Sequence, residues 1–190
     1  MSRKEVALYE EIGFWGTTAK DFRGRLSALG LKPEDELLVA LNSPGGEVYD
    51  GLAIYAMVKH APCAKRIVRI DGIAASMGSV IAMAGDEIEM GDGALMMIHD
   101  PSGACWGTAD DMRELAEVLD KHKSELVSIY ERRSKKSADE IGALMAAETW
   151  FTGAEAVAAG FADRVGGAVQ AEARFRAQAL DRSEEHTSEL

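Results

Sequence analysis

A serine and a histidine in this 190-residue sequence stand in contexts that favour nucleophilic chemistry. Ser76 lies in Gly72–Ser79 (GIAASMGS), where small neighbours let a substrate backbone approach a hydroxyl at an expected strand-to-helix turn. Free N–H groups at the start of a helix can stabilise a developing oxyanion. A structural serine N-cap is the alternative. The segment is not a GxSxG motif, because Ala74 stands at its first glycine position.

His99 follows the apolar run Met96–Ile98, at the C-terminal edge of an expected strand, where the sites of α/β proteins cluster. An imidazole there can act as general base for a serine. A purely structural histidine is the alternative. No two of the four histidines have the spacing of metal ligands, so we predict no metal site.

A glycine-rich turn, Asn42–Gly46 (NSPGG), follows the expected strand Glu36–Leu41. Gly45 and Gly46 permit unusual backbone angles and close approach, so they can offer an N–H to an anion or to an extended peptide. A phosphate-binding loop is not predicted, because no GK[ST] follows. An ordinary turn is the alternative.

Spacing alone does not choose the carboxylate that would complete a catalytic triad. The candidates are Asp100, Asp110, Asp111, Glu148 and Asp163. Glu148 differs from the others because Thr-Trp-Phe follows it, and we expect that aromatic pair to be buried. A carboxylate beside a buried patch must be paired or hydrogen-bonded, since an unpaired charge there is costly. A surface glutamate at a helix end is the alternative.

Strand and helix patterns alternate along the chain, which predicts the α/β class. Strands are expected at Glu36–Leu41, Arg66–Asp71, Glu87–Met90 and Ala94–Ile98, and helices at Val48–His60, Ala74–Ala84, Thr108–Arg133, Ser137–Met145 and Gly153–Ala159. The long helix Thr108–Arg133 carries one apolar stripe, which either meets a partner or packs onto its own domain.

Composition narrows the function classes. Hydrophobic residues make up 47% of the chain, enough for a core. The net charge of -11 argues against a nucleic-acid binder. Two cysteines are too few for a disulfide framework.

The apolar run Ile73–Ala84 is too short to span a bilayer, and the N-terminus lacks a signal-peptide pattern. We therefore expect a cytoplasmic protein.

The sequence after Gly166 has no core-forming pattern. We therefore expect one domain over residues 1–166 and a disordered tail over 167–190. We interpret Arg182–Leu190 (RSEEHTSEL) as a sequencing artefact, because one reading frame of a common adapter encodes it. An ordinary polar tail is the alternative.

The segments NSPGG, GIAASMGS and MMIHDP occur in this order, and Trp150–Asp163 (WFTGAEAVAAGFAD) closes the series. With these motifs the chain resembles the ClpP family of serine peptidases, family S14, over Leu38–Val165. The segments Glu-Thr-Trp-Phe and Gly-Ile-Ala-Ala-Ser look most like the ClpP-like proteases of phage and prophage head-morphogenesis regions.

The resemblance implies catalytic roles. Ser76 is the nucleophile and His99 the general base. The third position, normally aspartate in the family, falls on Glu148, with Asp163 as a weak alternative.

The resemblance also implies roles for the backbone. The N–H groups of Gly46 and Met77 form the oxyanion hole. Gly45 and Gly46 border an extended substrate bound by strand addition. Ser79 and Ser102 are interpreted as structural. No metal or organic cofactor is implied.

The implied fold is a spiral of ββα units, shared with crotonases, from which a handle protrudes. The handle covers about 102–133 and includes a strand over Gly103–Gly107. The family's handles join rings, so the resemblance implies a homo-oligomeric ring, a heptamer or stacked rings.

The first functional hypothesis is an ATP-independent serine endopeptidase that processes phage capsid or scaffold protein and associates with proheads in the bacterial cytoplasm. A degradative subunit fed by an AAA+ unfoldase is an alternative; it is disfavoured because about 35 residues precede the first expected core strand and no docking motif is evident. A catalytically silent assembly protein is another; the intact Ser76 and His99 argue against it, and the glutamate at 148 is its best support. A crotonase-type acyl-CoA enzyme needs no Ser–His pair and is disfavoured.

Overall fold

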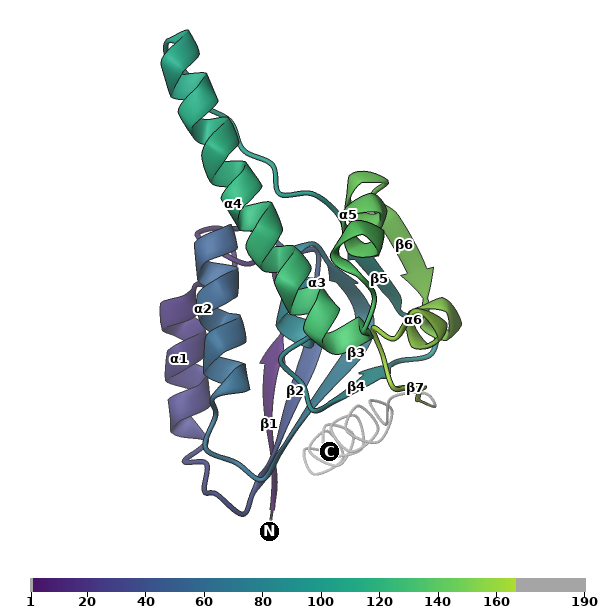
Figure 1. Cartoon of the computed structure of the whole chain (residues 1–190). Coiled ribbons are helices and arrows are strands. Elements are labelled where there is room, and N and C mark those ends of the chain that lie inside the picture. Colours follow the sequence, from purple (N-terminus) through teal and green to yellow (C-terminus); the bar gives the residue numbers. More distant parts are fainter. Residues whose placement is uncertain (1, 167–190) are drawn as a thin grey trace, which may run out of the picture.

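A parallel sheet carries the site-bearing segments of the chain (Figure 1). The computed structural model describes residues 2–166. Its central strands are β2 (Glu36–Ser43) and β3 (Lys65–Ala75), flanked by β1 (Arg3–Leu8) and β4 (Glu87–Met90). All of these pairs are parallel. The near-continuous apolar run of β2 is almost wholly buried, as expected for a parallel strand covered on both faces.

The long strand β3 has two different neighbours on one side. Its first half pairs with β4, and its last residues pair in parallel with β5 (Leu95–Ile98). On its other side β5 pairs antiparallel with β6 (Thr149–Thr152), and β7 (Arg164–Val165) extends the sheet beyond β4. Because β3 and β5 run in the same direction, the segments that follow them emerge at the same edge of the sheet.

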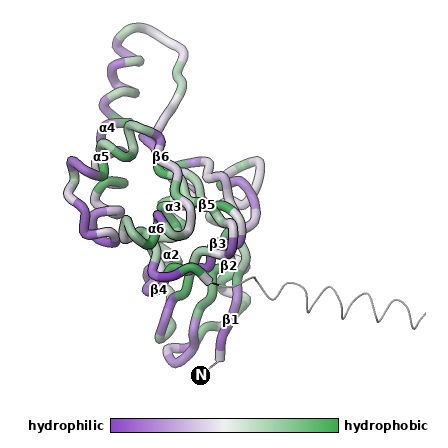
Figure 2. The backbone as a smooth tube through the Cα atoms, turned by 90° about the vertical axis from the view of Figure 1, so that its right-hand side faces the viewer, coloured by the Kyte–Doolittle hydropathy of each residue, from purple (hydrophilic) through white to green (hydrophobic). Residues whose placement is uncertain are grey.

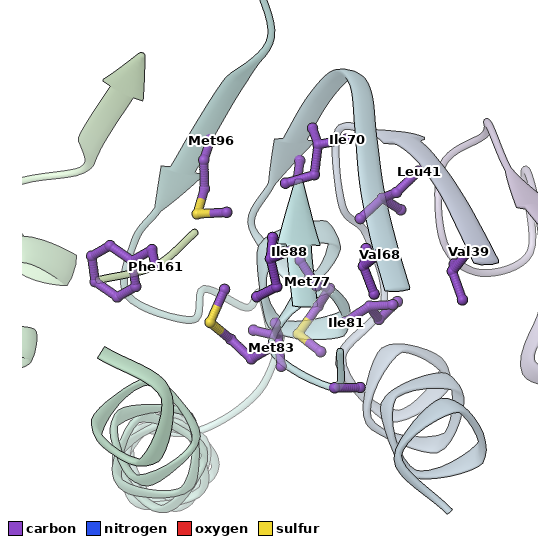
Figure 3. Packing of buried hydrophobic residues seen from close by; sticks show 14 of the residues in the cluster. Val39, Leu41, Val68, Ile70, Met77, Ile81, Met83, Ile88, Met96 and Phe161 are labelled. Carbon is purple, nitrogen blue, oxygen red and sulfur yellow. The ribbon is translucent and has the colours of Figure 1, made fainter. Parts of the chain in front are cut away.

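Five short or medium helices accompany the sheet. They are α1 (Ala19–Ala28), α2 (Val48–Lys59), α3 (Met77–Ala82), α5 (Ala138–Ala146) and α6 (Gly153–Ala159). Figure 3 shows side chains of β2 and β3, among them Leu41 and Val68, meeting Ile81 of α3 in the core. This buried α3 fixes the segment that immediately follows β3.

The helix α4 (Ala109–Ser134) projects from the body of the molecule (Figures 1 and 2). Thr108 and Asp111 form a capping box that starts it. One part of its apolar stripe packs onto its own domain, and another part is exposed and free to meet a partner. The C-terminal part, including Ile129 and Tyr130, is buried against the body, whereas Met112 near the tip is exposed.

The strand expected over Gly103–Gly107 is wrong, because these residues form no strand. Gly103 lies against the side chains of Leu115 and Leu119 of α4. A strand needs a hydrogen-bonding neighbour, and a helix beside this segment does not supply one. Trp106, in the same segment, is fully exposed.

The helix expected over Ala74–Ala84 begins only at Met77, since Ala74 and Ala75 belong to β3. Short runs of small apolar residues fit a buried strand and a buried helix equally well. The sequence reading also missed β1, α1, β6 and β7. The expectation that about 35 residues precede the first core strand is therefore wrong, because β1 already lies at Arg3–Leu8.

The other expected elements are present. The strands over Arg66–Asp71 and Glu87–Met90 and the helix beginning near Val48 are confirmed. Ser137 caps α5 with Glu140, and Gly160 ends α6 in the left-handed conformation. The α/β class is confirmed. The expected tail 167–190 lies outside the described residues.

Within residues 2–166, none of the helices combines the length and apolar character needed to cross a membrane. The same part of the chain contains no cluster of three or more His, Cys, Asp or Glu side chains able to hold a metal ion.

Candidate active site

Ser76 and His99 meet at the edge where β3 and β5 end. The Ser76 Oγ lies 2.8 Å from the Nε2 of His99, and both side chains are half-buried. The Ser76 N–H donates to the Met97 carbonyl at 3.0 Å, which ties the serine to β5. Two residues 23 positions apart in sequence thus form a hydroxyl–imidazole pair.

The backbone of Ser76 is strained. Its φ is 53° and its ψ is -125°, outside the regions that side chains prefer. Such a conformation costs on the order of 1–3 kcal/mol and is held by its surroundings. Ser76 occupies the N-cap position of α3, as the alternative expects, but its side chain makes no cap hydrogen bond.

Gly45 packs directly against this serine. A Cβ added at Gly45 would lie 2.6 Å from the Cβ of Ser76 and 3.0 Å from the Met77 nitrogen. Its φ is 99°. Only glycine fits beside the strained serine, so packing and backbone conformation both require Gly45 in this turn.

Gly46 exposes its backbone edge to the site. Ile12 bridges the glycine turn by donating to the Gly45 carbonyl at 2.8 Å and accepting from the Glu47 N–H at 2.9 Å. In this parallel pattern the N–H and C=O of Gly46 itself point away from Ile12. Within residues 2–166 no acceptor is bonded to the Gly46 or the Met77 N–H.

One cavity of about 270 Å³ is lined by all four of the residues discussed above: Ser76, His99, Gly46 and Met77. Its remaining walls are mainly apolar and come from Pro44, Val48, Val80, Met97, Pro101, Ser102, Leu126 and Tyr130. The arrangement offers a nucleophile, a base and two amide donors around a space that an apolar side chain can occupy.

Four of the five candidate carboxylates have partners elsewhere. Asp100 accepts from Lys123 at 2.8 Å. Asp110 pairs with Arg113, and Asp111 accepts from the Thr108 N–H at the start of α4. Asp163 pairs with Arg133 and accepts from the Ile88 N–H. The structure joins none of these four to His99.

The fifth carboxylate, Glu148, lies at the end of the ladder that leads to His99. Ile98 and Thr149 form the last pair of the β5–β6 ladder, and His99 and Glu148 flank that pair. The Glu148 side chain is exposed, its φ is 47°, and its Oε1 accepts from the Trp150 Nε1 at 3.5 Å. In the described part of the chain no carboxylate is hydrogen-bonded to His99.

The prediction that both aromatic residues after Glu148 are buried holds for only one of them. Phe151 is buried, as expected, but Trp150 is exposed. Alternation along β6 explains the difference, because successive side chains of a strand face opposite sides of the sheet.

Sequence reasoning missed a buried contact beneath the serine. The Ser79 Oγ lies 2.8 Å from the Tyr130 hydroxyl, and both side chains are buried. Burial raises the pKa of the Tyr130 phenol well above its usual value. The two residues are 51 positions apart, and no local pattern signals their contact.

Comparison with known proteins finds relatives over most of the chain. Residues 1–168 match the family model described as Clp protease. The chain is 36% identical to "ATP-dependent Clp protease proteolytic subunit 2" of Nocardia farcinica (strain IFM 10152) over 169 residues, covering 85% of this chain and 83% of the relative. It is 32% identical to "ATP-dependent Clp protease proteolytic subunit" of Bacteroides fragilis (strain YCH46) over 166 residues, covering 83% and 75%. The chain therefore belongs to the Clp protease family, a family of serine peptidases.

Proposed function

We propose that the protein is a serine-type endopeptidase in which Ser76 is the nucleophile and His99 the general base. The observation that carries the proposal is the 2.8 Å contact between the Ser76 Oγ and the His99 Nε2. Two amide donors, on Gly46 and Met77, border the same cavity. A nucleophile, a base and an oxyanion hole are the parts that acyl transfer requires.

Acylation begins when the Ser76 Oγ attacks the carbonyl carbon of a peptide bond and its proton passes to the His99 Nε2. Negative charge develops on the carbonyl oxygen, and the N–H groups of Gly46 and Met77 stabilise it. The tetrahedral intermediate collapses with cleavage of the C–N bond, and His99 donates its proton to the leaving amine.

Deacylation repeats the sequence with water. His99 removes a proton from water as the water oxygen attacks the ester carbonyl carbon. The bond between the acyl carbon and the Ser76 Oγ breaks, and the proton returns to Ser76. The products are two shorter peptides and the original enzyme.

Glu148 is the proposed third member. A carboxylate that accepts from the Nδ1–H of His99 fixes the tautomer in which Nε2 can accept the serine proton. The end of the sheet ladder supports this role, because residues 99 and 148 flank its last pair, Ile98 and Thr149. Glutamate has one methylene more than the family's usual aspartate, which lengthens its reach from the β5–β6 edge.

The proposed substrate is an extended polypeptide. It would add as a strand along Gly45 and Gly46, since the backbone edge of Gly46 that faces away from Ile12 is open to pairing. Its side chain before the scissile bond would enter the apolar cavity.

The proposed assembly is a homo-oligomeric ring, a heptamer or a pair of stacked rings. The projecting α4, its exposed Met112 and the exposed Trp106 of the segment before it support a role for the handle in contacts between copies. The proposed location is the bacterial cytoplasm.

Labelling with a serine-reactive fluorophosphonate tests the nucleophile. We expect wild type to be labelled and Ser76→Ala to remain unlabelled. Ser102→Ala is the matched control, since Ser102 lines the same cavity without a hydrogen bond to His99, and it should be labelled like wild type. Equal labelling of wild type and Ser76→Ala would contradict the assignment by revealing another reactive residue, and labelling of neither would favour a silent assembly protein.

Two hypotheses for the biological role follow from different observations. The Glu-Thr-Trp-Phe and Gly-Ile-Ala-Ala-Ser segments support ATP-independent processing of phage capsid or scaffold protein. The relatives' names, which read "ATP-dependent Clp protease proteolytic subunit", support a degradative subunit that works with an AAA+ unfoldase. Incubation of the oligomer with the capsid and scaffold proteins of the same genome, without ATP, separates them. Discrete cleavage fragments support processing, whereas intact proteins support dependence on an unfoldase.

A further inference from the structure

A buried chain of hydroxyl groups connects the handle helix to the strained serine. The Tyr130 hydroxyl of α4 lies 2.8 Å from the Ser79 Oγ, and the Ser79 Oγ lies 2.6 Å from the Ser76 carbonyl oxygen. Ser79 has no exposed surface, and Tyr130 has almost none. A buried hydroxyl without a hydrogen-bond partner is costly, so these hydrogen bonds hold both side chains in place.

The direction of the hydrogen bonds follows from a count of protons. The carbonyl oxygen of Ser76 can only accept, so Ser79 uses its single hydroxyl proton to donate to it. Tyr130 must then donate its own proton to the Ser79 Oγ. The phenol is held in its neutral form by burial, which keeps that proton in place.

The Ser76 carbonyl belongs to the same peptide unit as the Met77 N–H. A trans peptide is planar, and its C=O and N–H point in opposite directions. Whatever holds the Ser76 carbonyl toward the interior therefore turns the Met77 N–H outward, to the cavity that Met77 lines.

The backbone also restrains this carbonyl. It accepts from the Ser79 N–H at 3.0 Å, an ordinary length for such a bond, and from the Val80 N–H at 3.3 Å, so the Ser79 hydroxyl is a further donor to the same oxygen. These amides belong to α3, which has only 6 residues. So short a helix gains little from its own hydrogen bonds.

We propose that Ser79 and Tyr130 are positioning residues that orient the Met77 N–H of the oxyanion hole by holding the Ser76 carbonyl. The inference rests on the proposed peptidase function and deepens it. Ser79 then has a role beyond packing, and Tyr130, a buried residue of the handle helix, helps to support the site.

The first experiment separates kcat from KM. Purified Ser79→Ala and Tyr130→Phe oligomers are assayed with a fluorogenic peptide amide that carries leucine before the scissile bond. Active sites are counted by fluorophosphonate labelling. We expect kcat per site to fall about tenfold for Ser79→Ala and roughly threefold for Tyr130→Phe, since loss of a whole oxyanion donor costs about 10²–10³-fold. KM should stay within about twofold, because the misaligned donor acts on the transition state.

A double-mutant cycle supplies the second readout. Because the two hydroxyls act in series, Tyr130→Phe should change kcat little once Ser79 is alanine. Ser128→Ala is the control, since Ser128 lies on the same helix and its hydroxyl donates only to the Ser124 carbonyl. It should keep the kcat of wild type.

The outcomes are distinguishable. Unchanged kcat per site in both single variants, or fully additive losses in the double variant, overturns the positioning role, even where the melting temperature falls. Labelling of wild type but not of Ser76→Ala leaves the proposed function standing in that case. If wild type neither reacts nor cleaves, the proposed function fails, and the positioning role is overturned with it.

Discussion

Glu148 and His99 flank the last residue pair of the antiparallel β5–β6 ladder, which Ile98 and Thr149 form. We predict that Glu148→Gln lowers kcat by about 10²–10³-fold, because an amide cannot stabilise the imidazolium that forms on His99. Glu148→Asp should retain more activity than Glu148→Gln. Steady-state hydrolysis of a peptide amide measures both.

Asp163→Asn is the control for this prediction. Asp163 accepts from the Ile88 N–H and pairs with Arg133, so its substitution should lower the melting temperature and leave kcat per labelled site near that of wild type. A large loss of kcat in Asp163→Asn, with full activity in Glu148→Gln, would reverse the assignment of the acid.

His99→Gln should reduce kcat by about 10³-fold or more, since the Ser76 hydroxyl then lacks a base at 2.8 Å. The side chain is only half-buried, so the free energy of unfolding should change little. Rapid-quench peptide assays and denaturant titrations measure the two quantities. A catalytically normal His99→Gln would refute the role of the imidazole.

Gly46→Ala should destabilise the fold and abolish activity. Its φ of 141° is unfavourable for alanine, and the new Cβ would collide with the Ile12 carbonyl oxygen. We expect a loss of about 1–3 kcal/mol in the free energy of unfolding. Gly24→Ala is the matched control, because Gly24 is exposed within α1 and a Cβ there meets nothing within 4 Å. It should raise stability by roughly 0.5–1 kcal/mol. Equal stability of the two variants would contradict this account.

Asp35 should contribute to stability in a defined pH range. Its carboxylate accepts from the N–H and the hydroxyl of Ser2 and from the Lys32 N–H, and these bonds lower its pKa to about 2. A lowered pKa in the folded state stabilises the protein above the ordinary pKa near 3.8, and this stabilisation disappears as the pH falls toward 2.

The measurement for Asp35 is denaturant unfolding of wild type and Asp35→Asn at a series of pH values. Wild type should be the more stable at pH 7, and the difference should shrink between about pH 4 and pH 2. Asp92→Asn, at an exposed turn, is the control and should match wild type throughout. A difference that is independent of pH would show that ionisation of Asp35 does not matter.

Trp106→Ser tests the assembly. The side chain of Trp106 is fully exposed beside the handle helix, an unusual position for a large apolar group unless another copy covers it. We expect light scattering to give wild type a mass that is a multiple of 20.4 kDa, and Trp106→Ser a smaller particle at the same concentration. A wild-type protein that is monomeric at all concentrations would contradict ring assembly.

The sequence predicts those features that a short run of consecutive residues determines. Ser76 and His99 were found because each follows an apolar strand, and parallel strands bring their C-terminal ends to one edge. Caps such as Ser137 with Glu140 were found for the same reason, since the capping box is a property of four consecutive residues.

The remaining features depend on contacts that no local pattern records. Tyr130 meets Ser79 only when α4 packs over α3. The strand expected at Gly103–Gly107 needs a neighbour that the described residues do not provide. Ala74 and Ala75 join β3 because β5 pairs with them, a choice that small apolar residues leave open.

The division of β3 between two partners has a consequence during synthesis of the chain. The proposed nucleophile, Ser76, follows this strand, its proposed base, His99, follows β5, and the glycines that border Ser76 follow β2. A nascent polypeptide leaving the ribosome therefore holds these groups apart until β2, β3 and β5 have paired. The proposed peptidase would be inert toward neighbouring unfolded chains until that pairing is complete.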